Sequence, residues 1–330
     1  MRRRKFIALF GGAAAAWPLV ARAQQAGKVW RIGLVAGGAR PVPLETSAYA
    51  GFLQGMRELG YVEGRDFVIE WRFAEGRYEL LPEFAAEFAR LRVDLIVLAA
   101  GGFAIPPMRQ ANPDIPIVMG YSVDPVGQGF VASLARPGGN TTGLASALEE
   151  IMAKQVDLLV STVPSLARVA VLTNPANPSN PIIFRSAEAA AQQARITLLP
   201  AKAQNAEEIK NVFDTVTKEH VDAVIVQVDA LFFAQRQLIA ELALRNRLPS
   251  IFGNREYVEA GGLMSYGDSI REFLRQSASF VDKIIKGAKP GDLPIEQPTK
   301  FNLVINRKTA DGLGVTIPPQ LYIFADEVVE

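Results

Sequence analysis

YSVDPVGQGFVASLARPGGNTTGL, residues 121–144, separates two similar runs of strand and helix signals. In the first run, the apolar segment Val93–Val97 is followed about one helix later by Ile115–Val118. In the second run, Val221–Val226 is followed at a similar interval by Leu248–Phe252. Two similar α/β halves joined by one polar passage rich in Gly and Pro predict a two-lobed protein with a cleft between the lobes.

The first residues are typical of an export signal rather than of folded structure. Four basic residues at positions 2–5 precede an apolar stretch over residues 6–20 and an A-x-A cleavage motif at Ala21–Ala23. The order Arg3-Arg4-Lys5-Phe6-Ile7 resembles the twin-arginine signal. The alternative is an N-terminal membrane anchor, but residues 6–20, broken by Trp17-Pro18, are fewer than the about 20 that a spanning helix needs. We therefore expect a signal peptide that is cleaved after Ala23 and a mature protein in the periplasm.

The composition of the mature chain excludes several classes of protein. Removal of residues 1–23 leaves 307 residues and takes away five of the 35 basic residues and none of the 34 acidic ones, so that 30 basic and 34 acidic residues give a net charge of −4. This balance provides no basic surface for DNA or RNA, so no nucleic-acid partner is expected. The sequence has no cysteine, which excludes disulfides and a lipoprotein anchor. No later apolar run reaches spanning length, so no stable membrane insertion is expected.

The first half alternates between strand and helix signals. Val29–Val35 is mostly apolar, and apolar residues at helical spacing follow over Tyr49–Leu59. Phe67–Phe73 alternates as a strand, and Leu81–Phe88 has the spacing of a helix. Val93–Ala99 is a continuous apolar run, as expected of a strand that is covered on both faces. This order predicts a parallel sheet with right-handed crossovers.

In such sheets, ligands bind outside the carboxyl ends of the strands. The first half has three loops at this position, Ala36–Arg40, Ala100–Phe103 and Gly120–Asp124. No loop has the G-x-G-x-x-G or G-x-x-x-x-G-K-[ST] spacing, so no nucleotide cofactor is expected. The candidate ligand-binding residues of these loops are Gly37, Gly38, Gly101, Phe103, Tyr121 and Asp124.

The second half repeats the pattern. After a helix over Ala147–Val160, the strand Arg168–Leu172 opens onto the loop Thr173–Asn180. Asn, Pro and Ser are ordinary turn residues, but the equivalence of this loop to Ala36–Arg40 favours a role in binding. The strand Asp222–Val228 ends at a carboxylate, and a later apolar run ends at an aromatic residue. The candidate ligand-binding residues here are Asn174, Asn177, Asp229 and Phe252.

Later segments suggest further crossings between the lobes. Gly261–Asp268 is punctuated by Gly, contains the candidates Ser265 and Tyr266, and precedes a long helix over Ser269–Lys286. Phe301–Asn306 is a late strand preceded by Pro298. Several crossing segments form a hinge about which lobes close as rigid bodies. The expected lobes are residues 28–143 plus about 266–295, and residues 144–265 plus about 296–330.

The passage at 121–144 therefore has two expected roles. Tyr121–Val126 is the last rim loop of the first lobe and the start of a helix, in which Asp124 is either the N-cap or a ligand contact. Arg136–Gly143 is the expected crossing, because its glycines can absorb the dihedral changes of closure. The candidate hinge residues are Gly138, Gly139, Asn140, Gly143 and Gly267.

No constellation of side chains points to catalysis. The single histidine, His220, comes just before a strand and hence at the end opposite the expected site. One His and no Cys leave few possible ligands for a metal. The paired carboxylates Glu149-Glu150 and Glu207-Glu208 stand at expected helix starts, where acidic residues are favoured by the helix dipole. The sequence indicates a binding protein without a metal or cofactor.

Long motifs in this chain resemble the ABC-transporter substrate-binding family related to the tryptophan- and tyrosine-binding proteins. They cover essentially the whole mature chain. These motifs are DPVGQG at 124–129, ASLARPGGNTTG at 132–143, GGLMSYGD at 261–268, IKGAKPGDLPIEQPTKFNLVIN at 285–306 and ADEVVE at 325–330. The resemblance implies the type I periplasmic-binding fold, with two Rossmann-like lobes, three crossings and a ligand between the lobes.

The resemblance also implies a monomeric receptor that hands a small-molecule ligand to a membrane permease driven by a cytoplasmic ATPase. It implies an amino-acid ligand, with aromatic amino acids bound by characterised relatives. Asp124 or Asp229 would then bind the ammonium group, and Ser265 with backbone N–H groups the carboxylate. The rings that would stack on the ligand are those of Phe103, Tyr121, Phe252 or Tyr266. Two alternatives remain open: a sensor for a membrane receptor, and a binder of aromatic acids or other small carboxylates.

Overall fold

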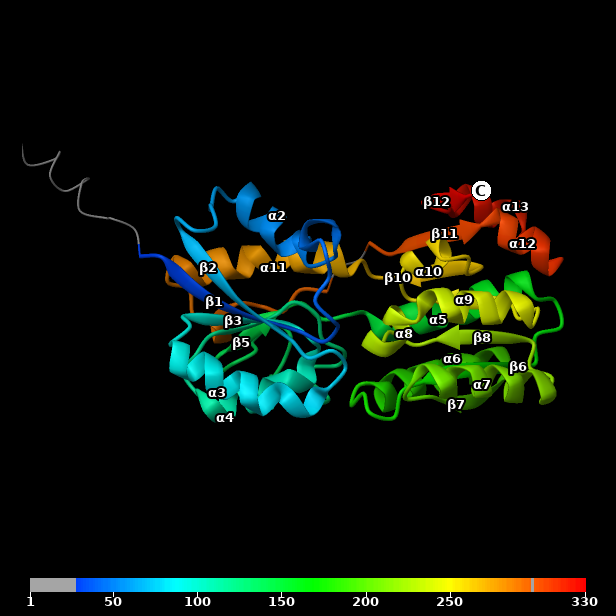
Figure 1. Cartoon of the computed structure of the whole chain (residues 1–330), viewed down its shortest axis with the longest axis horizontal. Helices are drawn as coiled ribbons and strands as arrows, with labels where there is room; N and C mark the ends of the chain where they lie inside the picture. Colours follow the sequence, from blue (N-terminus) through cyan, green and yellow to red (C-terminus); the bar gives the residue numbers. More distant parts are fainter. Residues whose placement is uncertain (1–27, 298–299) are drawn as a thin grey trace, which may run out of the picture.

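The computed structural model describes residues 28–297 and 300–330, which form two α/β lobes side by side (Figure 1). The expected signal peptide and Pro298 lie outside the described residues. In each lobe, helices cover both faces of a mostly parallel sheet. The prediction of two Rossmann-like lobes is therefore confirmed.

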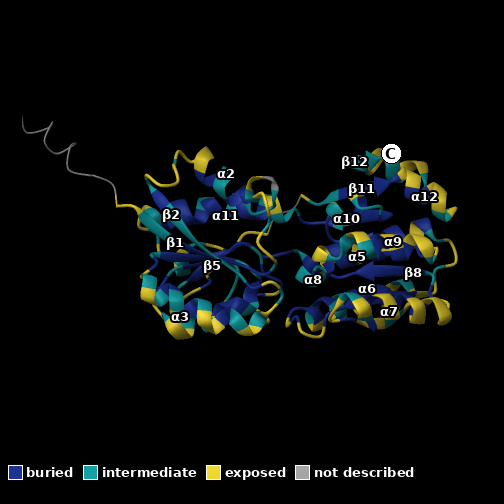
Figure 2. Cartoon of the chain, viewed as in Figure 1, coloured by how far each residue is buried: buried dark blue, intermediate teal, exposed yellow. Residues whose placement is uncertain are grey.

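The first lobe contains a five-stranded parallel sheet in the order β2-β1-β3-β4-β5. Helices α2 and α11 pack on one face of this sheet, and α3 and α4 pack on the other. The inner strands β1, β3 and β4 are mostly buried, which explains their largely apolar sequences, whereas the edge strand β2 is half-buried (Figure 2). The strands are β1 (Trp30–Ala36), β2 (Phe67–Phe73), β3 (Leu95–Ala99), β4 (Ile117–Met119) and β5 (Thr141–Gly143). The helices are α2 (Ala50–Glu58), α3 (Leu81–Leu91), α4 (Ile105–Ala111) and α11 (Ile270–Ile285), with 3-10 turns at Leu44–Thr46, Tyr78–Leu80, Gly102–Ala104 and Pro290–Asp292.

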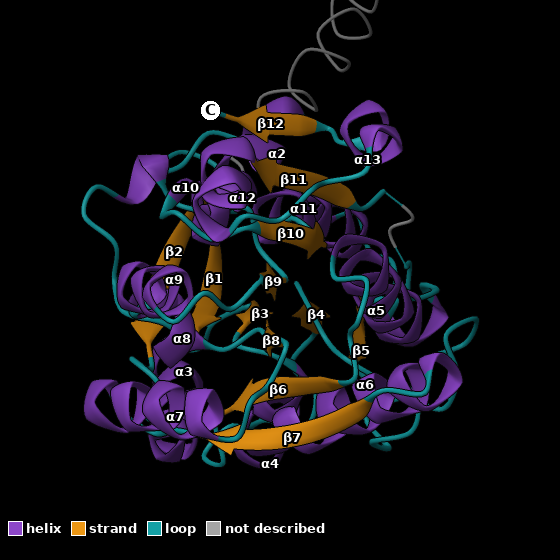
Figure 3. Cartoon of the chain, turned by 90° about the vertical axis from the view of Figure 1, so that its right-hand side faces the viewer, coloured by secondary structure: helices purple, strands orange, loops and turns teal. Residues whose placement is uncertain are grey.

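The second lobe contains a seven-stranded sheet in the order β12-β11-β10-β9-β8-β6-β7. Only the pair β10–β11 is antiparallel among the described strand pairs of this sheet. Figure 3 shows the helices of this lobe around its sheet. The strands are β6 (Arg168–Thr173), β7 (Thr197–Lys202), β8 (Ala223–Val226), β9 (Ser250–Phe252), β10 (Met264–Gly267), β11 (Asn302–Asn306) and β12 (Glu327–Val329). The helices are α5 (Leu148–Thr162), α6 (Asn180–Ala194), α7 (Ala206–Lys218), α8 (Ala230–Ala234), α9 (Arg236–Arg245), α10 (Glu256–Glu259), α12 (Arg307–Leu313) and α13 (Pro319–Phe324).

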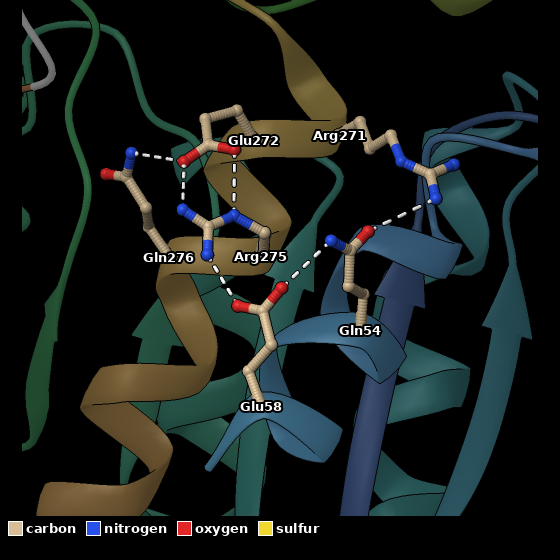
Figure 4. Close-up of polar contacts among 6 residues, drawn as sticks. All are labelled: Gln54, Glu58, Arg271, Glu272, Arg275 and Gln276. Carbon is tan, nitrogen blue, oxygen red and sulfur yellow. Dashed lines mark hydrogen bonds and ion pairs between the residues drawn. The ribbon is translucent and has the colours of Figure 1, made fainter.

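Helix α11 returns to the first lobe and packs closely against α2. Gly51 and Gly55 make this possible, because a Cβ at either position would overlap the backbone carbonyl oxygen of Arg271 or Arg275. Polar side chains then join the two helices along their exposed side (Figure 4). Arg275 Nη1 lies 2.5 Å from Glu58 Oε2 of α2, and its Nη2 lies 2.7 Å from Glu272 Oε1. The helix that follows β10 is thus attached to the first sheet.

The chain passes between the two sheets at three places. The first passage follows Gly143, the second follows Gly267, and the third lies between Glu296 and Phe301. The first and third run side by side, because Ala145 N donates to Glu296 O over 3.0 Å. Among the described residues, no helix combines the length and apolar character needed to span a membrane.

Two expectations for residues 121–144 were wrong. No helix begins at Tyr121–Val126; residues 121–130 form turns instead, because Asp124 has a positive φ of 40°. Arg136–Gly143 is not the crossing either. Thr141–Gly143 is the strand β5, which pairs in parallel with β4. Because β5 is still part of the first sheet, the crossing begins only after Gly143.

Candidate functional site

A small cavity of about 30 Å³ lies between the two lobes, beside the first two crossings. Its volume is enough for about one or two water-sized groups. The carboxyl ends of β8, β9 and β10 form its second-lobe wall, together with α5 and α6. The residues that line it are Tyr121, Ser146, Leu148, Ile151, Met152, Gln155, Ile183, Val226, Gln227, Val228, Gly253, Asn254, Gly267, Asp268 and Ile270.

A buried carboxylate joins the two crossings at this cavity. Ser146 Oγ, in the first crossing, donates a 2.6 Å hydrogen bond to Asp268 Oδ2, in the second. Asp268 is 9% exposed, and its Oδ1 has no hydrogen-bond partner. Burial raises the pKa of Asp268 from its usual 3.8 to about 6, although the hydrogen bond from Ser146 opposes this change.

Tyr121 forms the first-lobe wall of the cavity. Its ring packs edge to face on Phe273 of α11, with 5.4 Å between the ring centroids and 83° between the planes. Burial and the nearby negative charge of Asp268 raise the pKa of the Tyr121 hydroxyl, so it remains protonated at neutral pH. Tyr121 is thus held in place by its own lobe while it faces the polar groups of the crossings.

Two asparagines and an aspartate form a second cluster at the ends of β6 and β8. Asn177 Nδ2 donates to Asp229 Oδ2 over 2.8 Å, and Asn174 Nδ2 lies 3.2 Å from both carboxylate oxygens. Asp229 Oδ1 also accepts from the backbone N–H groups of Leu231 and Phe232, so it caps α8. The sequence-predicted residues Asn174, Asn177 and Asp229 are therefore brought together, but they satisfy one another.

The first-lobe rim faces this cluster. Tyr78 and Phe103 pack edge to face, with 4.8 Å between their centroids. Burial raises the pKa of Tyr78, and the charges of Asp229 and Tyr49 add to this rise. Gly37 lies against the Tyr78 ring, since a Cβ at Gly37 would be 3.7 Å from that ring. Gly38 lies against the Tyr49 hydroxyl, since a Cβ at Gly38 would be 3.3 Å from its oxygen.

Several other predicted site residues lie elsewhere. Phe252 is fully buried and stacks on Tyr257 at 4.5 Å, so its ring belongs to the core of the second lobe. This corrects its assignment as a ligand-stacking ring. Asp124 is exposed, and its Oδ1 accepts a 2.8 Å hydrogen bond from Gly127 N–H within its own turn.

Three further candidates lie close to the core of their own lobe. Gly101 has a φ of 98° and lies against the ring of Phe103, so it shapes the rim loop. Ser265 is 2% exposed within β10. Tyr266, its neighbour, packs against Phe301 with 5.7 Å between centroids. Gly101 supports the rim loop, and Ser265 and Tyr266 are part of the second sheet; none of the three lines the cavity.

The predicted hinge residues separate into two groups. Gly138 and Gly139 lie at the amino end of β5, where Gly138 N–H donates to Gly291 O over 3.1 Å. Asn140 is anchored there too, because its Nδ2 donates to Ile115 O over 2.6 Å. These three residues precede β5 and belong to the first lobe, so they lie outside the crossing, which corrects their assignment. Gly143 and Gly267 end β5 and β10 and lead directly into the first and second crossings.

Sequence reasoning missed five polar residues of the cavity: Ser146, Gln155, Gln227, Asn254 and Asp268. Gln227 and Asp268 each follow a strand, so the rule that selected Asp229 also points to them. Gln155 is 1% exposed on the apolar face of α5, and an amide at such a position is a signal that sequence reading can detect. Ser146 carries no such signal.

The arrangement suits binding rather than covalent chemistry. The cavity combines uncharged amides, one carboxylate, apolar walls and the ring of Tyr121. Among the described residues, no group of three or more His, Cys, Asp or Glu side chains is placed to hold a metal ion. Mixed apolar and polar lining of this kind is typical of a small-molecule site.

Comparison with known proteins agrees with this geometry. A family model described as ABC transporter substrate binding protein matches residues 43–329. The Tyrosine-binding protein of Clostridioides difficile (strain R20291) is 23% identical over 273 residues, which cover 83% of this chain and 78% of that protein.

Solved structures share the two-lobed fold. The ABC domain in complex with L-Trp from Streptococcus pneumonia superimposes with a TM-score of 0.82 at 24% identity, over 91% of this chain and 100% of that one. A ligand-free, open substrate-binding protein with adhesive properties from Clostridium difficile gives a TM-score of 0.65 at 21% identity, over 91% and 99%.

Proposed function

This chain belongs to the ABC transporter substrate-binding protein family, as its sequence motifs predicted, and from that premise we propose that it captures an amino acid between its two lobes. Aromatic amino acids are the first candidates. The ligand is then delivered in the periplasm to a membrane permease driven by a cytoplasmic ATPase. The proposed role is binding without catalysis, which the description of the family as substrate-binding proteins supports.

One observation carries the proposal: the cavity at the lobe boundary combines polar groups with apolar walls and the ring of Tyr121. Asp268, Gln155 and Gln227 provide polar groups, while Leu148 and Ile151 provide apolar surface. An amino acid has the same combination of charged and apolar parts. The names of two similar proteins add support, since one is called a tyrosine-binding protein and another was solved with L-Trp.

We propose that capture occurs by closure of two rigid lobes, residues 28–143 with about 266–295 and residues 144–265 with about 296–330. Gly143, with a φ of 129°, and Gly267 stand where strands end and crossings begin. Bending at a few residues of this kind is typical of hinge closure. The close packing of α11 on α2 supports the assignment of α11 to the first lobe.

A thermal-shift screen tests the proposed function. The mature chain is mixed with L-tryptophan, L-tyrosine, L-phenylalanine, other amino acids, aromatic acids without an amine, and sugars. A ligand at about 100 times its Kd stabilises the folded state by about 2.7 kcal/mol, a shift of several degrees. If aromatic acids shift the melting temperature and no amino acid does, the amino-acid assignment is wrong and the carboxylate alternative is favoured.

A further inference from the structure

The cavity between the lobes contains acceptor atoms that the protein leaves unpaired. Asp268 Oδ1, Gln155 Oε1 and Gln227 Oε1 are buried without a hydrogen-bond partner, and so is Gln227 Nε2. The three side chains are 9%, 1% and 2% exposed. Buried polar atoms normally have partners, so this concentration of unpaired acceptors at one cavity indicates a group that arrives with a ligand.

The charge of the cavity defines the kind of group. Asp268 is the one acidic residue that lines it, and none of its described lining residues is Lys or Arg. The Ser146 hydroxyl satisfies only Asp268 Oδ2. A cation would stabilise an ionised carboxylate in such surroundings, and a primary ammonium carries three N–H donors for three acceptors.

The size of the cavity agrees with this group. A volume of about 30 Å³ accommodates an ammonium group but not a whole amino acid. The apolar wall formed by Ile151, Met152 and Ile183 adjoins the same space, so an apolar part of the ligand has surface to contact.

The carboxylates selected from the sequence are less suitable. Asp229 already accepts from two asparagine amides and two backbone N–H groups. Asp124 is exposed to solvent and accepts from Gly127. Solvent screening weakens an exposed pair, whereas a desolvated pair is strong.

We infer that Asp268, assisted by the side-chain oxygens of Gln155 and Gln227, binds the ammonium group of the ligand between the first two crossings. This inference rests on the proposed function, because it specifies how that site recognises an amino acid. The bound ammonium lies beside the Ser146–Asp268 hydrogen bond. The carboxylate of Asp268 therefore contacts the ligand and also joins the two crossings of the hinge.

Isothermal titration calorimetry with purified mature protein tests the inference. The wild-type protein, Asp268→Asn and Gln227→Leu are titrated with L-tryptophan, L-tyrosine and their analogues without the amine, indole-3-propionate and 3-(4-hydroxyphenyl)propionate. Asp268→Asn is expected to weaken binding of the amino acids by about 30-fold or more, as for loss of one partner of a buried charge pair. It should leave the affinity for the analogues within about 3-fold of that of the wild type, which removes the preference for the amine. Gln227→Leu should cause a smaller loss, of about 5-fold, as for a neutral hydrogen bond.

Asp282→Asn is the matched control. Asp282 is also 9% exposed, but it lies in α11 and contacts Tyr61 and Lys286. Asp282→Asn removes a buried carboxylate that does not line the cavity. It should therefore leave the affinity for the amino acids unchanged.

The outcomes separate the inference from the proposed function. If the wild type binds an amino acid and folded Asp268→Asn binds it equally well, the inference is overturned and the function stands. The wild type is also titrated with tyramine and tryptamine, which keep the amine and lack the carboxylate. If it binds either amine but no amino acid, the function fails and the ammonium site stands. Binding of neither the amino acids nor the amines overturns both.

Discussion

Ser146 and Asp268, 122 positions apart in the sequence, are joined by a 2.6 Å hydrogen bond that connects the first crossing between the lobes to the second. The bond leaves one carboxylate oxygen of Asp268 unpaired at the cavity. A buried carboxylate that lacks a cation costs stability in the empty protein. The Asp268 carboxylate in the hinge region therefore lowers the stability of the empty protein while it serves the proposed binding of the ligand.

The first prediction concerns this cost. The pKa of Asp268 is raised from 3.8 to about 6, so between these values the folded protein holds a proton that the unfolded chain has released. Stability therefore falls as pH rises through this range, and the cost of about 3 kcal/mol is fully present above about pH 6. Asp268→Asn cannot ionise, so it should be about 1–3 kcal/mol more stable than the wild type at about pH 7.5.

Urea unfolding at about pH 4.5 and about pH 7.5 measures this difference. The advantage of Asp268→Asn should fall to about a third of its value at the lower pH, because Asp268 is then protonated in the folded wild type while most unfolded chains have released this proton. If Asp268→Asn is less stable than the wild type at the higher pH, ionised Asp268 does not destabilise the folded protein and the prediction is wrong.

The second prediction concerns the contact between α2 and α11. Gly51→Ala and Gly55→Ala each raise helix propensity by about 1 kcal/mol, but the added methyl group overlaps a backbone carbonyl oxygen of α11. Backbone cannot move aside as a side chain does, so the overlap should outweigh the propensity. We expect each variant to lose about 2 kcal/mol or more of stability.

Thermal unfolding compares these variants with Arg57→Ala, an exposed change in the same helix that should stay within about 0.5 kcal/mol of the wild type. An increase in melting temperature for Gly51→Ala would mean that α2 and α11 separate without cost.

The third prediction concerns the cluster around Asp229. Asp229→Ala removes the cap of α8 and leaves the buried amides of Asn174 and Asn177 without their acceptor. The two losses together should cost about 2–4 kcal/mol. Asp124→Ala removes one exposed hydrogen bond and should cost less than about 1 kcal/mol. Equal urea midpoints for the two variants would contradict the structural role of Asp229.

The fourth prediction distinguishes two phenylalanines that the sequence places on equal terms. Phe103 lies at the first-lobe rim beside Tyr78, whereas Phe252 is fully buried against Tyr257. Phe103→Ala should lower the affinity for an aromatic amino acid by about 10-fold with a small effect on stability. Phe252→Leu should lower stability by about 1 kcal/mol and leave affinity unchanged.

Calorimetry and thermal unfolding on the same two variants provide the check. The assignment fails if Phe252→Leu reduces affinity more than Phe103→Ala does while both proteins remain folded.

Much of the fold could be predicted because its signals are local. β3 and β8 are short, continuous apolar runs, and such runs indicate strands covered on both faces. The two similar halves therefore predicted two lobes. β5 gave no such signal, since Thr141–Gly143 has only three residues and polar side chains. Its pairing with β4 explains why the crossing was expected too early in the chain.

The candidate site divides in the same way. Asn174 and Asp229 follow strands, and the strand-end rule found them from sequence alone. The sequence determined that polar groups stand at the ends of parallel strands, because periodicity and turn residues locate those ends. Only the tertiary structure decided which carboxylate lacks a partner. Asp268 Oδ1 faces the cavity unpaired where the two crossings meet. The position of the second crossing depends on the packing of α11, which follows Asp268 directly, against α2, which lies in a remote part of the sequence.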